Sequence, residues 1–254
     1  LTIMRELLAD HGSMVVHCDF RVDSHLRMIM DDVFGPGRYT NQIVWNYATG
    51  GASKEFFACK HDILLYYRKS DKYKFYPDRV REQRTEKALQ RAQNPIGARI
   101  SADDTTKLPT DVWQIPALNP MAVERLNYPT QKPEDLLTKV LLATSDPGNL
   151  VMDIFCGSGT TLAVAEKLGR RWIGCDLGRW GIHVSRKRLL GIDNCKPFEI
   201  LNLGKYERQY WQGVTFAENG KTLTERALYE YLAFVLKLYK AQPVAGMDHL
   251  HGKK

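Results

Sequence analysis

One glycine-rich stretch decides the fold, and it reads Asp153-Ile154-Phe155-Cys156-Gly157-Ser158-Gly159-Thr160-Thr161. Apolar runs typical of strands and patterns typical of helices alternate around it, at residues 150–152, 162–168, 172–176, 180–190 and 198–201. The links between these segments are short. Strands that alternate with helices in this way predict an α/β fold built on a doubly wound, mostly parallel sheet.

The sequence before this stretch supplies further elements. A helix begins at Pro133, and apolar patterns of both kinds lie at residues 1–9, 14–18, 22–33, 43–45 and 63–67. The first of these patterns is expected to place four side chains on one helical face, namely Ile3, Met4, Leu7 and Leu8. Between residues 68 and 127 the periodicity fades, and ten Lys and Arg stand against four Asp and Glu from Arg68 to Arg99. This basic stretch is typical of a small insertion or of a mobile loop region.

The composition narrows the class of protein. The 254 residues carry 36 Lys and Arg against 29 Asp and Glu, a net charge of +7, which favours a polyanionic partner only weakly. No apolar run reaches the roughly 18 residues of a membrane span. The five cysteines contain no C-x-x-C pair, and no two histidines have metal-ligand spacing. We therefore expect reduced thiols, a cytoplasmic location, no metal site and no membrane partner.

The glycine-rich stretch predicts a ligand site. Gly157 and Gly159 let the backbone turn tightly and approach a ligand, and the helix that begins near Thr160 directs free N–H groups at it. Asp176 ends the next strand, where a carboxylate can accept both hydroxyls of a ribose. The alternative is a plain tight turn with an acidic residue nearby.

Two residues decide between cofactors. A dinucleotide fingerprint G-x-G-x-x-G would need glycine at position 162, where the chain has Leu162. Asp153 would also repel a pyrophosphate that lies against the loop. S-adenosylmethionine has no phosphate and carries cationic ammonium and sulfonium groups, so it fits better than a nicotinamide dinucleotide. A nicotinamide-dependent oxidoreductase with a nonstandard loop stays open as a rival class.

Three motifs together resemble a known family. Residues 153–161 are similar to its D-x-F-x-G-S-G-T-T motif, residues 127–133 to its P-T-Q-K-P segment, and residues 169–176 to its ribose-binding strand. The family is the permuted, beta-class group of amino-group DNA methyltransferases, which includes the modification subunits of type III restriction systems. The resemblance covers roughly the first 205 residues.

The resemblance implies S-adenosylmethionine as cofactor and methyl transfer to the exocyclic amine of adenine, or else cytosine, in a base flipped out of double-stranded DNA. A restriction subunit and a second copy of the chain are further partner hypotheses. The cofactor would contact residues of all three motifs, namely Thr130, Gln131, Lys132, Asp153, Phe155, Gly157, Ser158, Gly159, Thr160, Thr161 and Asp176.

The resemblance also divides the chain. Residues 1–67 would be part of the catalytic half, 68–127 a target-recognition insertion, 128–205 the cofactor-binding half and 206–254 a helical extension. Basic residues that would contact DNA phosphates lie near the start of the insertion, at Arg68, Lys69, Arg79, Arg81 and Arg84. The alternative for these residues is a solvated, charged face anchored by tyrosines.

One family motif is missing. The catalytic tetrapeptide is a polar or acidic residue, two prolines and an aromatic residue, and this chain contains no adjacent prolines. In the permuted order the tetrapeptide would precede Leu1, so we interpret the chain as truncated there. We name no catalytic residue and expect the chain alone to lack turnover. A non-catalytic DNA-binding or cofactor-binding remnant is the second rival class.

Several conspicuous residues have ordinary interpretations. Cys156 is expected to serve as a small residue within the loop and not as a nucleophile. The run Arg186-Lys187-Arg188 is predicted to be a solvated helix face, and Trp45 and Trp113 to be core or rim aromatics. For His17 and Asp19, which follow a predicted strand, we favour a loop cap over a place in an active cleft.

Overall fold

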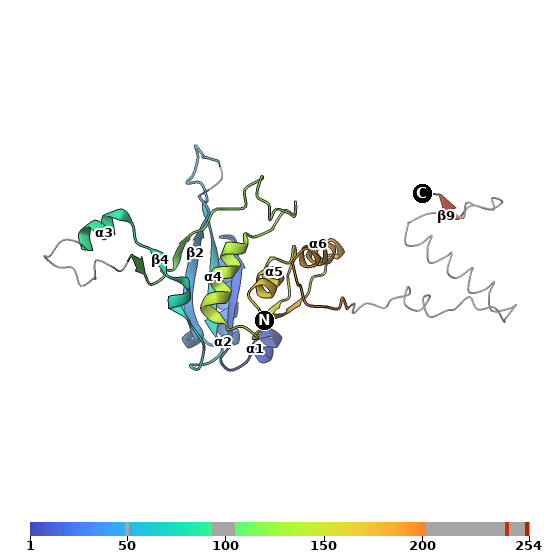
Figure 1. The fold of residues 1–254 in the computed structure, drawn as a ribbon, viewed down its shortest axis with the longest axis horizontal. Coiled ribbons are helices and arrows are strands. Elements are labelled where there is room, and N and C mark those ends of the chain that lie inside the picture. The colour runs from blue at the N-terminus through green and yellow to red at the C-terminus, as the bar shows by residue number, and fades with distance from the viewer. Residues whose placement is uncertain (49–50, 93–104, 202–241, 244–251, 254) are drawn as a thin grey trace. The chain divides into compact units, whose positions relative to one another are not determined.

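The computed structural model describes residues 1–48, 51–92, 105–201, 242–243 and 252–253. Residues Leu1–Lys196 form one compact unit (Figure 1). In the second unit, Pro197–Lys254, the described strands β9 (Gln242–Pro243) and β10 (Gly252–Lys253) pair in antiparallel fashion. The helix expected within 206–254 lies outside the described residues.

Four strands form the larger sheet of the first unit, in the order β1-β3-β2-β6. Their bounds are Ser13–Cys18 (β1), Tyr39–Asn46 (β2), His61–Arg68 (β3) and Val112–Gln114 (β6). β3 is antiparallel to both β1 and β2, while β6 is parallel to β2. Pairing here is therefore less parallel than expected. β3 returns directly beside β2 through a loop, with no helical crossover of the kind that parallel neighbours need.

A second, parallel pair carries the glycine-rich stretch. β7 (Leu150–Asp153) and β8 (Arg171–Gly174) are joined by helix α5 (Thr160–Lys167), and α6 (Arg179–Leu190) follows β8. This strand–helix–strand–helix order confirms the α/β class. The strand predicted at residues 198–201 is wrong. That segment has no strand pairing within the described part of the chain, and its apolar residues Ile200 and Leu201 are exposed.

Alternation along β3 separates two apolar layers. Ile63, Leu65 and Tyr67 pack with α2 (Asp23–Phe34) on one face of the sheet. Leu64 and Tyr66 pack on the other face with α4 (Glu134–Thr144), which lies across the sheet in Figure 1. The period of two along a strand therefore places the core on both sides of β3.

The first helix, α1 (Thr2–Leu7), buries only part of its apolar surface. Met4 and Leu8 pack against the core, whereas Ile3 is 71% exposed and Leu7 is 64% exposed. The four side chains therefore do not share one buried face. Ile3 and Leu7 form one i, i+4 stripe, and Met4 and Leu8 form the next, about 100° around the helix.

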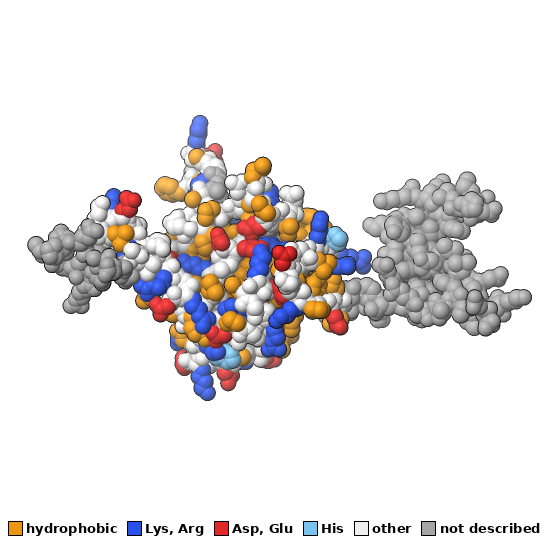
Figure 2. Space-filling view, in the orientation of Figure 1, with side chains coloured by type: hydrophobic (Ala, Val, Ile, Leu, Met, Phe, Trp, Pro, Cys, Tyr) orange, Lys and Arg blue, Asp and Glu red, His pale blue; other side chains and the backbone are white. Residues whose placement is uncertain are grey.

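Short elements follow β3 in the basic segment. They are a 3₁₀ turn at Pro77–Val80, strands β4 (Glu82–Gln83) and β5 (Thr106–Lys107), which pair with each other, and helix α3 (Glu86–Ala92). A further 3₁₀ turn, Pro36–Arg38, precedes β2. Figure 2 shows that Lys and Arg side chains are spread over this face of the molecule and are not confined to one segment. None of the described helices is long and apolar enough to cross a membrane.

Candidate cofactor site

The loop between β7 and α5 depends on two glycines. Gly157 has φ +49° and Gly159 has φ +71°, a left-handed conformation that L side chains rarely adopt. Gly159 is also the N-cap of α5. A Cβ on Gly159 would lie 2.6 Å from Ser185 Oγ and 3.0 Å from Ser185 Cα. The loop is therefore fixed both by backbone conformation and by close packing against α6.

Asp176 is bound to this loop. Its Oδ2 accepts a hydrogen bond from the backbone N–H of Gly157 at 2.8 Å, and its Oδ1 accepts one from Gly178 N–H at 2.7 Å. An ionised carboxylate offers about four acceptor positions, so acceptor capacity remains for hydroxyl groups of a ligand. The structure thus brings together the two ends of the predicted site, which are 19 residues apart in sequence.

Asp153 and Thr161 form the second polar pair of the loop. Asp153 Oδ1 accepts from Phe155 N–H at 3.1 Å, and its Oδ2 accepts from the Thr161 hydroxyl at 2.6 Å. These bonds hold a negative charge at the end of β7. The Phe155 side chain is 78% exposed beside them.

The hydroxyls of Ser158 and Thr160 are used inside the protein. Both residues are buried, and their oxygens lie 3.2 Å apart. The Thr160 hydroxyl donates to the carbonyl of Lys132 at 3.2 Å and accepts from Arg188 Nη1 at 2.9 Å. What the start of α5 offers a ligand is therefore backbone N–H groups rather than these hydroxyls.

Arg188 corrects one expectation. Its side chain is only 6% exposed and donates to Glu134 Oε1 at 2.8 Å, whereas the run Arg186-Lys187-Arg188 was expected to be a solvated face. Arg186 and Lys187 are exposed as expected. Because the period of a helix is 3.6 residues, the third residue of the run faces inward while the first two face solvent. Three adjacent basic residues in the sequence give no indication of this difference.

The predicted segment 128–133 is held against the loop. Tyr128 lies over Gly157, 3.2 Å from the position of a Cβ there, and stacks on Trp180 with ring centroids 4.9 Å apart. Gln131 braces the segment, because its side chain accepts from Leu126 N–H at 2.8 Å and donates to the carbonyl of Glu124 at 2.6 Å. The sequence alone did not single out Tyr128 or Trp180.

Thr130 and Lys132 have different surroundings. Thr130 is exposed and makes no polar side-chain contact within the described residues. Lys132 is half-buried, with Nζ 5.8 Å from the centre of the Trp45 ring. Burial lowers the pKa of Lys132, and the nearby Asp62 carboxylate opposes that shift.

A histidine–aspartate pair lies beside Lys132. His17 Nε2 is 2.9 Å from Asp62 Oδ2. The His17 and Trp45 rings are in an edge-to-face arrangement, with their centroids 5.8 Å apart. Burial lowers the pKa of His17, and Lys132 lowers it further against the opposing effect of Asp62. The loop-cap interpretation holds for Asp19, which accepts from Arg21 N–H at 3.0 Å. The loop-cap interpretation did not identify Asp62 as the partner of His17, because the two residues are 45 positions apart in sequence.

Cys156 and the two tryptophans occupy the places expected of them. Cys156 is buried, with Sγ 4.0 Å from Ser185 Oγ, and burial raises the pKa of its thiol to about 11. A thiol with that pKa is a poor nucleophile near neutral pH. Trp45 and Trp113 are core residues whose indole N–H groups donate to backbone carbonyls at 2.7 and 2.8 Å.

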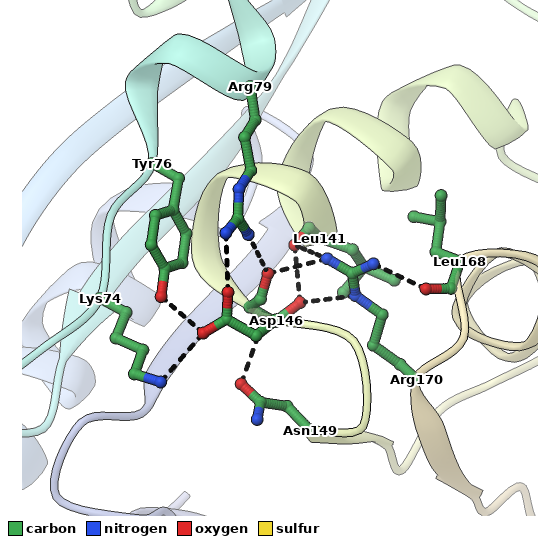
Figure 3. A network of polar contacts seen from close by, with 9 residues as sticks. Lys74, Tyr76, Arg79, Leu141, Asp146, Asn149, Leu168 and Arg170 are labelled. Carbon is green, nitrogen blue, oxygen red and sulfur yellow. Dashed lines mark hydrogen bonds and ion pairs between the residues drawn. The ribbon is translucent and has the colours of Figure 1, made fainter.

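A carboxylate just after α4, that of Asp146, contacts several side chains of the basic segment (Figure 3). Asp146 accepts from the Tyr76 hydroxyl at 2.5 Å, from Arg79 Nη2 at 2.8 Å and from Lys74 Nζ at 3.0 Å. These three donors hold the pKa of Asp146 well below its usual range. Next to this network, Arg170 donates to the carbonyl of the neighbouring Ser145 at 2.8 Å. Arg79, a predicted DNA contact, is thus part of an intramolecular network.

The other predicted DNA contacts also have partners within the protein. Arg68 pairs with Asp71 at 3.4 Å, and Lys69 Nζ donates to backbone carbonyls at the end of α1. Arg81 pairs with Asp78 at 3.0 Å. Arg84 donates its backbone N–H to Thr105 at 2.9 Å, beside the β4–β5 pair. The structure does not gather these residues into one face of unpaired cations. Among the described residues, no cluster of His, Cys, Asp and Glu could hold a metal ion.

Comparisons with known proteins identify relatives of the chain. The chain is 35% identical over 156 residues to the DNA adenine methyltransferase YhdJ of Escherichia coli, covering 59% of this chain and 51% of the relative. It is 29% identical over 184 residues to the type II methyltransferase M.HpaI of Haemophilus parainfluenzae, covering 72% and 55%. The chain spans about half the length of these curated relatives.

Solved structures support the fold. The cytosine-N4-specific PvuII DNA methyltransferase matches with a TM-score of 0.55 at 18% identity, covering 77% of this chain and 69% of that chain. The M1.HpyAVI–SAM complex matches with a TM-score of 0.52 at 19% identity, covering 75% and 80%. The model of the N6/N4 type DNA methylase family matches residues 1–185. The chain therefore belongs to the N6/N4 family of DNA methylases.

Proposed function

We propose that the chain binds S-adenosylmethionine at the β7–α5 loop and belongs to an enzyme that methylates the exocyclic amine of adenine in double-stranded DNA. The observation that carries this proposal is the bond between Asp176 and Gly157, which places a carboxylate with acceptor capacity at the mouth of a glycine loop that begins a helix. That combination suits a ligand with vicinal hydroxyls and an anionic group.

The residues present suit this cofactor. Asp176 would hold the ribose, the free N–H groups at the start of α5 would meet the carboxylate, and Asp153 would face the cationic groups. When bound, the cofactor supplies an electrophilic methyl group. The negative charge of Asp153, fixed by Thr161 and Phe155 N–H, opposes a pyrophosphate and so disfavours the nicotinamide alternative.

Adenine is proposed over cytosine because a relative at 35% identity is a DNA adenine methyltransferase. Mass spectrometry of nucleosides from treated DNA separates N6-methyladenine from N4-methylcytosine. A cytosine product would contradict the choice of base and leave the cofactor site intact. A restriction subunit, a second copy of the chain and a cytoplasmic location also stay predictions.

This chain alone is proposed to bind cofactor without turnover, since its sequence contains no adjacent prolines. A single-turnover assay with tritiated S-adenosylmethionine and mixed-sequence duplex DNA tests this. Product formed by this chain would show that other residues supply the tetrapeptide's role. A longer natural chain that includes an upstream D/N/S-P-P-Y/F segment and still lacks product would favour the non-catalytic rival.

Calorimetric titration tests the site directly. Asp176→Ala should weaken S-adenosylmethionine binding by about 1–3 kcal/mol, the cost of leaving hydrogen-bonding groups unpaired. Asp193→Ala, at an exposed acidic residue just after α6, is the matched control and should bind like the wild type. Circular dichroism checks that Asp176→Ala keeps its fold. Binding of NADH with no binding of S-adenosylhomocysteine would overturn the proposal.

A further inference from the structure

Helix α6 divides its residues sharply between two faces. Gly181, Val184, Ser185, Arg188 and Leu189 are buried against the rest of the unit. The exposed residues fall within an arc of roughly 120° at 100° per residue, and they are Arg179, Trp180, His183, Arg186, Lys187 and Leu190. We call this set the α6 face. It is basic, with one aromatic and one aliphatic side chain.

The α6 face carries three cations, Arg179, Arg186 and Lys187. Within the part of the chain that the structure describes, Arg179, Arg186 and Lys187 make no side-chain hydrogen bond or ion pair, and α6 contains no acidic residue. The basic segment differs, since Arg79 and Lys74 direct their charges at Asp146. In Figure 2, blue and pale blue side chains lie at the place that α6 occupies in Figure 1.

The α6 face begins beside the candidate cofactor loop. Trp180 stacks on Tyr128, which itself lies over Gly157, and Gly178 just before the helix donates to Asp176. Twelve residues of helix extend about 18 Å from that point. A ligand that enters at the loop and continues along α6 would therefore meet three cations in succession.

We propose that the α6 face binds the phosphate backbone of the duplex DNA that flanks the target base. This inference rests on the proposed function, because it takes DNA as the partner. One DNA strand carries a phosphate about every 3.4 Å of helix axis, so a face about 18 Å long spans more phosphates than it has cations. Because α6 contains cations and no acidic residue, its charge complements a polyanion better than a protein surface of mixed charge.

The test compares two double variants that lose the same charge. Arg186→Gln/Lys187→Gln removes two cations of the α6 face. Arg5→Gln/Lys54→Gln removes two exposed cations that lie outside α6 and outside residues 68–127. Fluorescence anisotropy with a labelled 24-base-pair duplex measures Kd from 50 to 200 mM salt. All four residues are exposed, so circular dichroism should show both variants folded.

The α6 variant should bind the duplex at least about tenfold more weakly than the control at 50 mM salt. The slope of log K against log salt should fall in magnitude by about 1.8, since each lost phosphate contact removes about 0.9. Kd values equal to those of the control would overturn the inference. So would loss of binding to phosphatidylserine vesicles in the α6 variant with unchanged DNA binding, because the occupant would then be a membrane surface.

Titration of S-adenosylmethionine into the same proteins keeps this inference separate from the proposed function. Cofactor binding should be the same in the wild type and both variants. If none of them binds cofactor and the α6 variant still loses DNA affinity, the proposed cofactor site is wrong and the DNA surface stands.

Discussion

Arg188 and Glu134 form a largely buried ion pair, with Nη2 2.8 Å from Oε1, that ties α6 to the first turn of α4. The same guanidinium donates to Thr160 at the start of α5. Glu134 also accepts from Lys167 at 2.6 Å, and its pKa is lowered because these donors outweigh the opposing effect of burial. One arginine therefore joins three helices around the candidate cofactor loop.

Removing that guanidinium should destabilise the unit. In Arg188→Ala, Lys167 would be the one remaining cation at the Glu134 carboxylate among the described residues. We expect the free energy of unfolding to fall by about 2–4 kcal/mol, near the lower end of the range for breaking a buried ion pair. Urea unfolding followed by circular dichroism measures it. Arg186→Ala, two residues away and exposed, should change stability by no more than about 0.5 kcal/mol. Equal effects in the two variants would contradict the structural role of Arg188.

Close packing at the loop can be separated from backbone strain with two glycines of the same conformation. Gly159 and Gly169 both have φ +71°, but a Cβ would meet Ser185 at 2.6 Å in the first case and nothing within 4 Å in the second. Gly169→Ala should cost about 1–2 kcal/mol, the penalty of a left-handed alanine. Gly159→Ala should cost more and abolish cofactor binding, as thermal unfolding and calorimetry would show. Similar losses in both variants would mean that packing at Ser185 is unimportant.

The network at Asp146 should make the free energy of unfolding depend on pH in the acidic range. Its pKa is depressed in the folded chain from an ordinary value of 3.8, so its contribution is fully present above about pH 4 and is lost as pH falls through the folded pKa. Asp146→Asn should therefore lower the urea midpoint at pH 7, and its deficit should shrink as pH falls from 4 to 3. Asp78→Asn, an exposed partner of Arg81, is the control. A deficit that stays constant with pH would contradict the ionic role of Asp146.

His17 should impose a different pH dependence. Its folded pKa lies below the ordinary 6.5, so the unfolded chain binds a proton more readily and stability is lost as pH falls below 6.5 toward the folded pKa. The slope is at most about 1.4 kcal/mol per pH unit. His17→Gln should flatten the stability profile between pH 7.5 and 5.5, measured by thermal unfolding. A slope in His17→Gln equal to that of the wild type would contradict this role of His17.

Local patterns in the sequence were sufficient for much of the unit. Helical periodicity predicted α2, α4, α5 and α6, and apolar runs predicted β1, β2, β3, β7 and β8, because each such segment has a face that must be buried. The strand expected at residues 198–201 failed, since an apolar run becomes a strand only if a neighbour pairs with it. Pairing directions around β3 were likewise invisible from local patterns.

The sequence by itself determined the glycine loop, Asp153 and Asp176. The conformation and chemistry of the loop depend on residues adjacent in sequence, and Asp176 follows Gly157 at a fixed interval of 19 residues. Only the tertiary structure decided how the cations are used. It buried Arg188 and paired Arg79 with Asp146, and among the described residues it gave Arg186 no charged partner. Pairing of a charge depends on a partner brought close by folding, and that partner is often tens of residues away, so the local sequence carries no sign of it.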